Sequence, residues 1–158
     1  MVELVVRRPA PAEREIVEPG ELDPVFGLVG DRWHTEPGKH GLEAQLTLMN
    51  SRVAALVAGA RDNWALAGDQ LYVDLDLSSA NLPPGTQLRV GSAVIAVTAV
   101  PHKGCGKFVR RFGTEAQKLV NSPAGRELCL RGINARVLRG GLVRSGDAIE
   151  KLELAPTG

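Results

Sequence analysis

The chain has few cysteines, few aromatic residues, no excess of either charge and no long apolar run. Its 158 residues include two cysteines, too few for a disulfide framework or for an iron–sulfur cluster with four thiolate ligands. One disulfide, between Cys105 and Cys129, is all that the sequence permits, and cytosolic thiols normally stay reduced. The net charge of +1 gives no overall electrostatic reason to bind nucleic acid or a membrane surface.

The absence of a long apolar segment bears on location. A membrane-spanning helix needs about 18 or more apolar residues, and no such segment or secretory signal is visible. We therefore expect a cytoplasmic protein without a membrane or nucleic-acid partner. Aromatic residues make up 4% of the chain and hydrophobic residues 44%, so the core should consist mainly of Val, Leu, Ile and Ala.

The pattern of apolar and polar residues along the chain predicts many short strands. Alternation of apolar and polar residues indicates strands, and the two-residue spacing at Gly91-Ser92 is typical of a hairpin. Expected strands are residues 2–8, 44–49, 71–77, 87–90 and 93–100, two around Gly140-Gly141 and one at the C-terminal end. Residues 9–24, rich in proline and acidic side chains, are expected to be a loop.

The helices are expected to be short and to gather after Cys105. An N-cap at Asn50 or Ser51 predicts one earlier helix, ending near Gly59. Later helices are expected at residues 106–112, at 114–121 with a capping box from Thr114 to Gln117, and from Pro123 with Ser122 as its N-cap. This order favours a single domain over residues 1–158 with an α+β fold, mostly β and barrel-like.

Cys105 lies in PHKGCGKFVRRFG, residues 101–113, among several basic side chains. A thiolate is the reactive form of cysteine, and its pKa falls near cations and at a helix start. If the helix began earlier, however, Cys105 would share a face with Phe108 and Phe112 and be a packed core residue. Spacing alone favours the packed residue, because buried inert cysteine is common. Cys129, between two leucines, is expected in the core or at its boundary.

Other candidate sites are weaker. The histidines His34, His40 and His102 do not have a zinc-binding spacing and are expected to be solvated loop residues. The basic run around Arg110, joined by Arg131 and Arg136, suits an anion such as phosphate, or else forms a solvated basic face. The glycine-rich pieces match neither a P-loop nor a dinucleotide-binding turn.

Several short pieces together resemble the MOSC domain, the C-terminal domain of molybdenum cofactor sulfurases. The pieces are Gly30-Asp31 with His34, Gln45-Leu46-Thr47-Leu48, Gly68-Asp69, Cys105, Phe112-Gly113, Asn121-Ser122-Pro123 with Gly125, Arg131-Gly132-Ile133 with Ala135-Arg136, Gly141, Val143 and Gly146-Asp147. The resemblance covers residues 25–152. It differs at Gly104, where many relatives have proline before the cysteine.

The resemblance implies a β-barrel-like fold with a few helices and a function for Cys105. Cys105 would be the family's reactive cysteine, which carries sulfur or coordinates the molybdenum of a pterin cofactor. It would thus be the catalytic and metal-binding residue of the chain. The expected cofactor-binding residues are His34, Asn121, Arg131 and Arg136.

The resemblance also implies partners and a reaction. The family receives sulfur from pyridoxal-phosphate enzymes, so a cysteine desulfurase is an expected partner, and this chain is too short to contain one. A likeness to hydroxylaminopurine-resistance proteins implies a reductase of N-hydroxylated compounds, supplied with electrons by a separate electron-transfer protein. The alternatives are a non-enzymatic sulfur carrier without bound molybdenum, or a scaffold in which Cys105 is inert.

Overall fold

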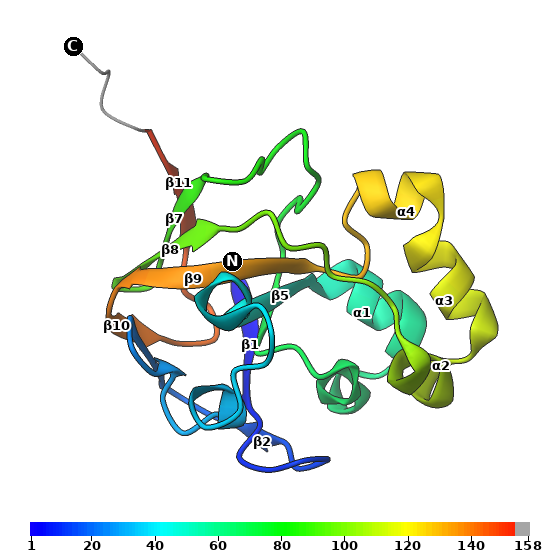
Figure 1. The fold of residues 1–158 in the computed structure, drawn as a ribbon, viewed down its shortest axis with the longest axis horizontal. Coiled ribbons are helices and arrows are strands. Elements are labelled where there is room, and N and C mark those ends of the chain that lie inside the picture. The colour runs from blue at the N-terminus through cyan, green and yellow to red at the C-terminus, as the bar shows by residue number, and fades with distance from the viewer. Residues whose placement is uncertain (154–158) are drawn as a thin grey trace.

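The computed structural model describes residues 1–153, and strands dominate it (Figure 1). The strands are β1 (Val2–Arg7), β2 (Glu15–Ile16), β3 (Gly20–Asp23), β4 (Gly27–Leu28), β5 (Leu46–Asn50), β6 (Leu71–Val73), β7 (Gln87–Val90), β8 (Ala93–Val97), β9 (Ile133–Arg139), β10 (Gly141–Val143) and β11 (Ile149–Leu152). The α-helices are α1 (Ser51–Ala58), α2 (Gly106–Phe112), α3 (Thr114–Asn121) and α4 (Pro123–Glu127), and the 3-10 helices are η1 (Arg32–His34), η2 (Gly41–Ala44) and η3 (Arg61–Ala67).

Most strands form one curled sheet. Its order is β11-β7-β8-β9-β5-β6-β1-β2, and β10, β3 and β4 form a second, small sheet. Neighbouring strands are antiparallel except β5 and β6, which α1 and η3 connect. The expected α+β, mostly β and barrel-like fold is therefore confirmed, and the hairpin at Gly91-Ser92 joins β7 to β8 as expected.

The sheet buries apolar side chains on both faces where β1, β5 and β6 lie. On the inner face, aliphatic residues such as Val5, Leu48 and Leu71 belong to the main core cluster. On the other face, Tyr72 belongs to a second cluster, together with Trp64 of η3. Strands covered on both faces read as nearly continuous apolar runs, which explains the composition of these segments.

The segment between β8 and β9 holds the three helices α2, α3 and α4, which gather on one side of the sheet (Figure 1). Ser122 is the N-cap of α4, and its Oγ accepts a hydrogen bond from the N–H of Gly125 at 2.9 Å, as expected. The capping box at Thr114 was wrong. Gly113 is the N-cap of α3, with φ 91°, and glycine has no side chain to cap with.

Two further expectations were wrong. Residues 9–24 contain β2 and β3 instead of a continuous loop, because β2 pairs with β1 and β3 pairs with the distant strand β10. The expected strand 71–77 ends at Val73, and the Asp76 carboxylate then accepts a hydrogen bond from the N–H of Ser78 at 2.9 Å, which turns the chain. The expected final strand, Ile149–Leu152, is present.

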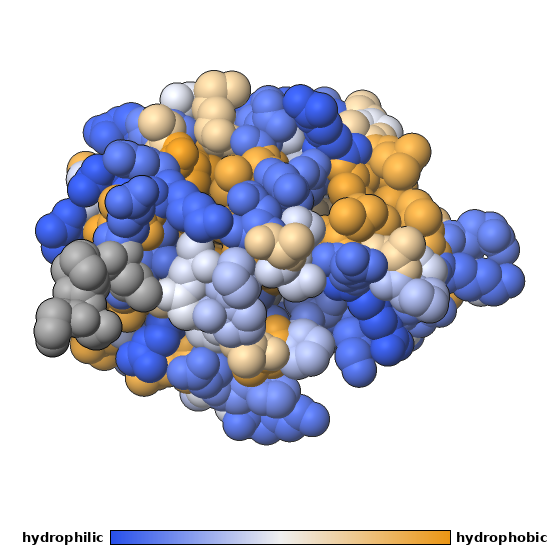
Figure 2. Space-filling model, turned by 90° about the horizontal axis from the view of Figure 1, so that it is seen from above, coloured by the Kyte–Doolittle hydropathy of each residue, from blue (hydrophilic) through white to orange (hydrophobic). Residues whose placement is uncertain are grey.

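The surface is mainly hydrophilic in the view of Figure 2, with apolar groups gathered toward the side where α3 and α4 lie in Figure 1. Exposed apolar residues of these helices and their ends include Leu119 and Leu128. No helix within residues 1–153 is long and apolar enough to cross a membrane.

Candidate functional site

Cys105 is the residue directly before α2, and its side chain is exposed. The helix begins at Gly106, so Cys105 does not join the apolar face of α2. Phe108 and Phe112 form that face, with ring centroids 5.1 Å apart. The packed-residue interpretation of Cys105 is therefore wrong. Both thiols are free, so Cys105 and Cys129 form no disulfide.

The backbone before Cys105 is clamped by α3. Asn121 Oδ1 accepts a hydrogen bond from the N–H of Gly104 at 3.0 Å, and Asn121 Nδ2 donates to the carbonyl of the same residue at 3.0 Å. A Cβ at Gly104 would lie 2.9 Å from Cγ2 of Val120, so a larger residue would press against α3. Asn121 thus positions Cys105 through the main chain.

The surroundings of Cys105 favour its thiolate. Partial burial by itself raises the pKa of Cys105. The backbone N–H groups of Phe108 and Lys107 and the charge of Arg131 outweigh this effect and lower the pKa below its usual value. An exposed thiol with a lowered pKa is the form of cysteine that acts as a nucleophile or a metal ligand.

Cys105 lines a pocket of about 170 Å³ that we call the cationic pocket. Its cationic lining residues are Arg8, Arg14, Arg32, Lys107, Arg111 and Arg131. His102 also lines it, and none of the described residues in its lining is a carboxylate. Guanidinium groups are planar donors that bind carboxylate and phosphate oxygens, so this lining suits an anion.

Two buried aspartates lie behind the pocket and orient its cations. Asp69 is completely buried and accepts a hydrogen bond from Arg131 Nη1 at 2.5 Å. His102 Nε2 lies 2.9 Å from the other oxygen of Asp69. Burial by itself raises the pKa of Asp69, but the charges and hydrogen bonds of Arg131 and His102 lower it well below its usual range. Because an ionised carboxylate only accepts hydrogen bonds, Nε2 of His102 carries the proton.

Asp31 holds Arg8 in the same way. Its carboxylate accepts hydrogen bonds from Nη2, at 2.8 Å, and Nε, at 3.0 Å, of Arg8. Burial by itself raises the pKa of Asp31, but the hydrogen bonds and charge of Arg8 lower it overall. The pair fixes one guanidinium at the pocket, where Arg8 Nη1 also donates to the carbonyl of Gly68 at 3.1 Å.

Arg14 is crowded by like charges. Burial lowers the pKa of Arg14, and repulsion from Arg111 and Arg8 lowers it further. Arg14 Nε donates to the carbonyl of Ala65 at 3.1 Å, and Arg111 Nη1 donates to that of Leu66 at 2.8 Å, so η3 holds both guanidinium groups. An anion placed between these arginines would relieve their repulsion.

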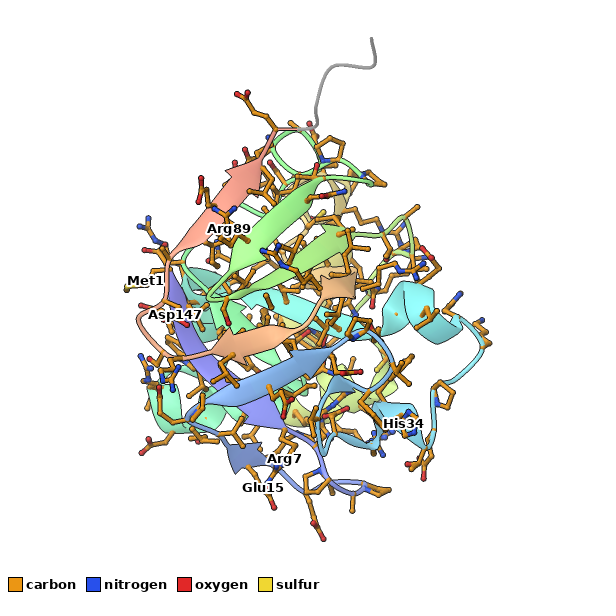
Figure 3. All side chains as sticks on the ribbon, turned by 90° about the vertical axis from the view of Figure 1, so that its left-hand side faces the viewer. Met1, Arg7, Glu15, His34, Arg89 and Asp147 are labelled. Carbon is orange, nitrogen blue, oxygen red and sulfur yellow. The ribbon has the colours of Figure 1, made fainter. Side chains whose placement is uncertain are left out.

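The structure brings together only some of the residues expected at the site. Arg131 lines the cationic pocket with Cys105, and Asn121 acts on Cys105 through Gly104. His34 is outside the pocket lining and exposed at the edge of the molecule (Figure 3), where its ring packs on Phe26 with centroids 4.4 Å apart. Arg136 lies on β9 and pairs with Glu43 at 3.5 Å, also outside the lining.

Sequence reasoning missed the cations at the start of the chain. Arg8 follows β1, Arg14 lies in the segment expected to be a loop, and Arg32 begins η1. No local sequence pattern marks these three arginines as pocket residues, because the contacts that place Arg8 and Arg14 join residues far apart in the chain. Nothing in the sequence around Gly68-Asp69 indicated that Asp69 would hold both Arg131 and His102.

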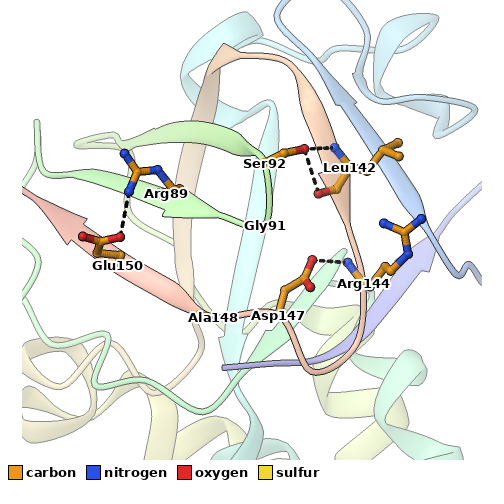
Figure 4. A pocket seen from close by; sticks show the side chains of 8 residues that line it. All are labelled: Arg89, Gly91, Ser92, Leu142, Arg144, Asp147, Ala148 and Glu150. Atoms are coloured by element: carbon orange, nitrogen blue, oxygen red, sulfur yellow. Dashed lines mark hydrogen bonds and ion pairs between the residues drawn. The ribbon is translucent and has the colours of Figure 1, made fainter.

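A wider hollow of about 340 Å³ involves the β7–β8 hairpin, β10 and β11 (Figure 4). Its polar groups are engaged with one another: Arg89 pairs with Glu150 at 2.7 Å, and Asp147 accepts from the N–H of Arg144 at 2.7 Å. Of the charged side chains in this hollow, Arg89 and Glu150 pair with each other, and Asp147 is engaged with the main chain of the turn between β10 and β11.

Comparison with known proteins adds a family match. Residues 41–150 match the family model described as "MOSC domain". None of the curated proteins matches the chain.

Solved structures share its fold. YiiM from Escherichia coli has a TM-score of 0.63 and 21% identity, over 98% of this chain and 70% of that one. The YuaD protein from Bacillus subtilis has a TM-score of 0.59 and 17% identity, over 94% and 92%. YiiM from Geobacillus stearothermophilus has a TM-score of 0.59 and 14% identity, over 97% and 73%. At these identities the likeness concerns the fold alone.

Proposed function

This chain belongs to the MOSC domain family, and we propose that it binds molybdenum cofactor, with the Cys105 thiolate as the protein's ligand to the metal. The observation that carries the proposal is the exposed thiol of Cys105, with its lowered pKa, in a pocket lined by six cations. The family as a whole is associated with molybdenum cofactor or with sulfur handling. The pocket supports that association for this chain.

The residues present fit such a group. A thiolate is a soft ligand, and arginines suit the phosphate that the cofactor carries. Residues 1–153 contain no group of three or more His, Cys, Asp or Glu side chains that could hold a bare metal ion. A metal that arrives with most of its ligands, as in a pterin cofactor, needs only one from the protein. When bound, the cofactor would supply redox chemistry that side chains lack.

The chain's own residues have separate tasks in this proposal. Arg14 and Arg111, whose repulsion an anion relieves, bind the phosphate. Asp69 orients Arg131, whose positive charge favours the thiolate of Cys105. His102, held by Asp69 through Nε2, gives the pocket a fixed imidazole edge beside Cys105.

The test is the metal and pterin content of protein purified from a host that makes the cofactor. We expect molybdenum and pterin in the wild type and in Cys129→Ser, and a strong loss of both in Cys105→Ser. Cys129→Ser is the matched control, because it removes the other thiol of the chain. Equal molybdenum in Cys105→Ser, or none in the wild type, contradicts the proposal.

An enzymatic form of the proposal is reduction of an N-hydroxylated compound. The reaction R–NHOH + 2 e⁻ + 2 H⁺ → R–NH₂ + H₂O needs two electrons, which a separate electron-transfer protein would supply. Loaded protein with a chemical reductant should convert such a compound to its amine, and Cys105→Ser should not. An equal rate with the variant would rule out a role for Cys105.

The second candidate is a sulfur carrier, with a persulfide on Cys105 and no molybdenum. The exposed sulfur favours it, because a desulfurase must reach the atom that it loads. Incubation with a cysteine desulfurase and cysteine should add one sulfur to Cys105 and leave Cys129 unmodified, as read by mass spectrometry of the two peptides. Persulfide without molybdenum supports the carrier; molybdenum lost in Cys105→Ser supports the cofactor ligand.

A further inference from the structure

A second pocket adjoins the cationic pocket, and His102 lines both. We call it the apolar pocket. Its volume is about 220 Å³, and it lies among the connector after β6, the loop after β8, the end of α4 and the start of β9. Its aliphatic lining residues include Leu82, Pro84, Val97, Val100, Pro101 and Ile133.

The polar side chains in its wall already have partners. Thr98 Oγ1 donates to the carbonyl of Glu43 at 2.5 Å, Asn134 Nδ2 donates to that of Val100 at 3.0 Å, and Ser79 Oγ donates to that of Glu127 at 3.1 Å. The charged residue in the lining, Arg126, is exposed. Apart from Arg126, the lining favours an uncharged, apolar group, since an ion buried against it would lose hydration without gaining partners.

The side chain common to both pockets is fixed. The ring of His102 is held through Nε2 by buried Asp69. Gly132 also lies against the ring: an added Cβ there would be 3.1 Å from Cδ2 of His102 and 2.3 Å from the carbonyl oxygen of Leu48. Arg131 lines the cationic pocket, and the next residue, Gly132, lines the apolar one. One imidazole therefore belongs to both an anion-binding lining and an apolar lining.

We propose that the two pockets form one bipartite site for an organic molecule that has an uncharged aromatic ring and an anionic group. The ring occupies the apolar pocket against Cys129, and the anionic group passes His102 to reach the arginines beside Cys105. The contrast in lining carries the assignment: six cations line one pocket, whereas the other has one exposed cation, Arg126, among paired polar groups and aliphatic walls. The anionic group would use the arginines to which the proposed function assigns the cofactor's phosphate, so this proposal concerns the protein without bound cofactor.

Joining the two groups in one molecule should raise affinity above that of either group alone. Once the ring is bound, the attached anionic group is held close to the cationic pocket. Its effective concentration there is therefore high. Each thiol reports on one pocket, because Cys105 lines the cationic pocket and Cys129 lines the apolar one.

The test measures how fast iodoacetamide alkylates each cysteine, peptide by peptide, with three probes. Inorganic phosphate should slow Cys105 alone, and 1-naphthol should slow Cys129 alone. The joined probe, 1-naphthyl phosphate, should slow both, with a half-protecting concentration at least tenfold below that of either single probe. The protein for this test is purified from a host that does not make the cofactor, so Cys105 carries no metal and failure here is distinguishable from failure of the cofactor proposal.

Filling the apolar pocket gives the matched variants. Ala99 lines the pocket and is exposed, so Ala99→Phe should block the ring and reduce the protection of Cys105 by 1-naphthyl phosphate to that given by inorganic phosphate. Ala60→Phe, at an exposed position outside both linings, should behave as the wild type. Unchanged alkylation of Cys129 with both naphthyl probes, or full protection in Ala99→Phe, overturns the proposal.

Discussion

The two cysteines of this chain have the same side chain and opposite environments. The pKa of Cys105 is lowered overall although partial burial by itself raises it, because backbone N–H groups and Arg131 favour the thiolate. Burial raises the pKa of Cys129. Reactivity should therefore differ between the two thiols at neutral pH.

We predict that the alkylation rate of Cys105 rises at lower pH than that of Cys129, because the rate follows the thiolate fraction. The measurement is the pH–rate profile of Cys129→Ser, which retains Cys105, against that of Cys105→Ser, which retains Cys129. Coincident midpoints, or a lower midpoint for Cys129, would show that the surroundings of Cys105 do not favour its thiolate.

The lowered pKa of Asp69 leads to a second prediction, which concerns the stability of the fold. Its pKa in the folded protein lies below the unfolded value of about 3.9, so its ionisation stabilises the fold above that pH and the contribution disappears as pH falls through the folded pKa. Asp69→Asn should lower the free energy of unfolding at pH 7 by about 3–5 kcal/mol, because Arg131 stays buried without its partner.

Denaturant titrations at pH 7 and near pH 3 measure this effect, and the difference between Asp69→Asn and the wild type should be smaller at the lower pH. The control is Asp74→Asn, because Asp74 is exposed and pairs with exposed Arg52 at 3.3 Å. That change should cost less than about 1 kcal/mol. A loss for Asp69→Asn that is the same at both pH values would mean that charge is not its cause.

At the scale of elements, local signals predicted those features that depend on a few adjacent residues. Asn50 Oδ1 caps α1, and the chain leaves the helix at Gly59 with φ 73°. Glycine and serine likewise marked the turn between β7 and β8. β2 and β3 could not be found in this way, because they are short, partly exposed strands whose partners lie elsewhere in the chain.

The same limit applied to the site. The local sequence pointed to Cys105 and to Arg131, which the structure places at one pocket. The sequence pieces around His34 and Arg136 occur in the same order as in the MOSC family. That order along the chain does not determine which side chains reach the pocket, and these two do not line it. The contacts that bring Arg8 and Arg14 to Cys105 are made across β1 and η3, and no spacing in the sequence encodes them.

The link between α3 and the Cys105 loop predicts the effect of Asn121→Ala. The change removes both hydrogen bonds to Gly104 and should lower the free energy of unfolding by about 1–3 kcal/mol. It should also move the pH midpoint of Cys105 alkylation upward, because the loop no longer holds the thiol near the N–H groups of α2.

Denaturant titration and the pH–rate profile test this. Asn63→Ala is the control, since Asn63 is exposed and its amide makes a single bond, to the carbonyl of Ala58 at 3.3 Å. A midpoint that stays unchanged in Asn121→Ala, despite lower stability, would confine Asn121 to a structural role.

At the scale of the whole molecule, the charge is nearly balanced but unevenly placed. The net charge is +1, yet six cations line one small pocket and the carboxylates that balance Arg8 and Arg131 are buried behind it. The net charge of the chain therefore correctly indicates that neither sign is in excess overall. It does not reveal the positive charge concentrated at the cationic pocket.

We predict that phosphate raises the melting temperature more than sodium chloride at equal ionic strength, because a specifically bound anion stabilises the folded state by mass action. At 100 times its Kd, phosphate should add about 2.7 kcal/mol to the free energy of unfolding. Differential scanning calorimetry over a phosphate series measures this.

Arg14→Gln should reduce the phosphate effect, since Arg14 is among the crowded cations of the pocket. The control is Arg89→Gln, an arginine that pairs with Glu150 outside the cationic pocket. Equal phosphate effects in the two variants would place the anion elsewhere.

The contributors to the cationic pocket divide at residue 41, where the match to the family model begins. Three of its six cations, Arg8, Arg14 and Arg32, come before that point, whereas Cys105 comes after it. Half of the pocket's positive charge thus comes from a different part of the chain than the sulfur. Substitutions at Arg14 or Arg32 could therefore alter which anions bind while leaving the core strand β1 and the thiol in place.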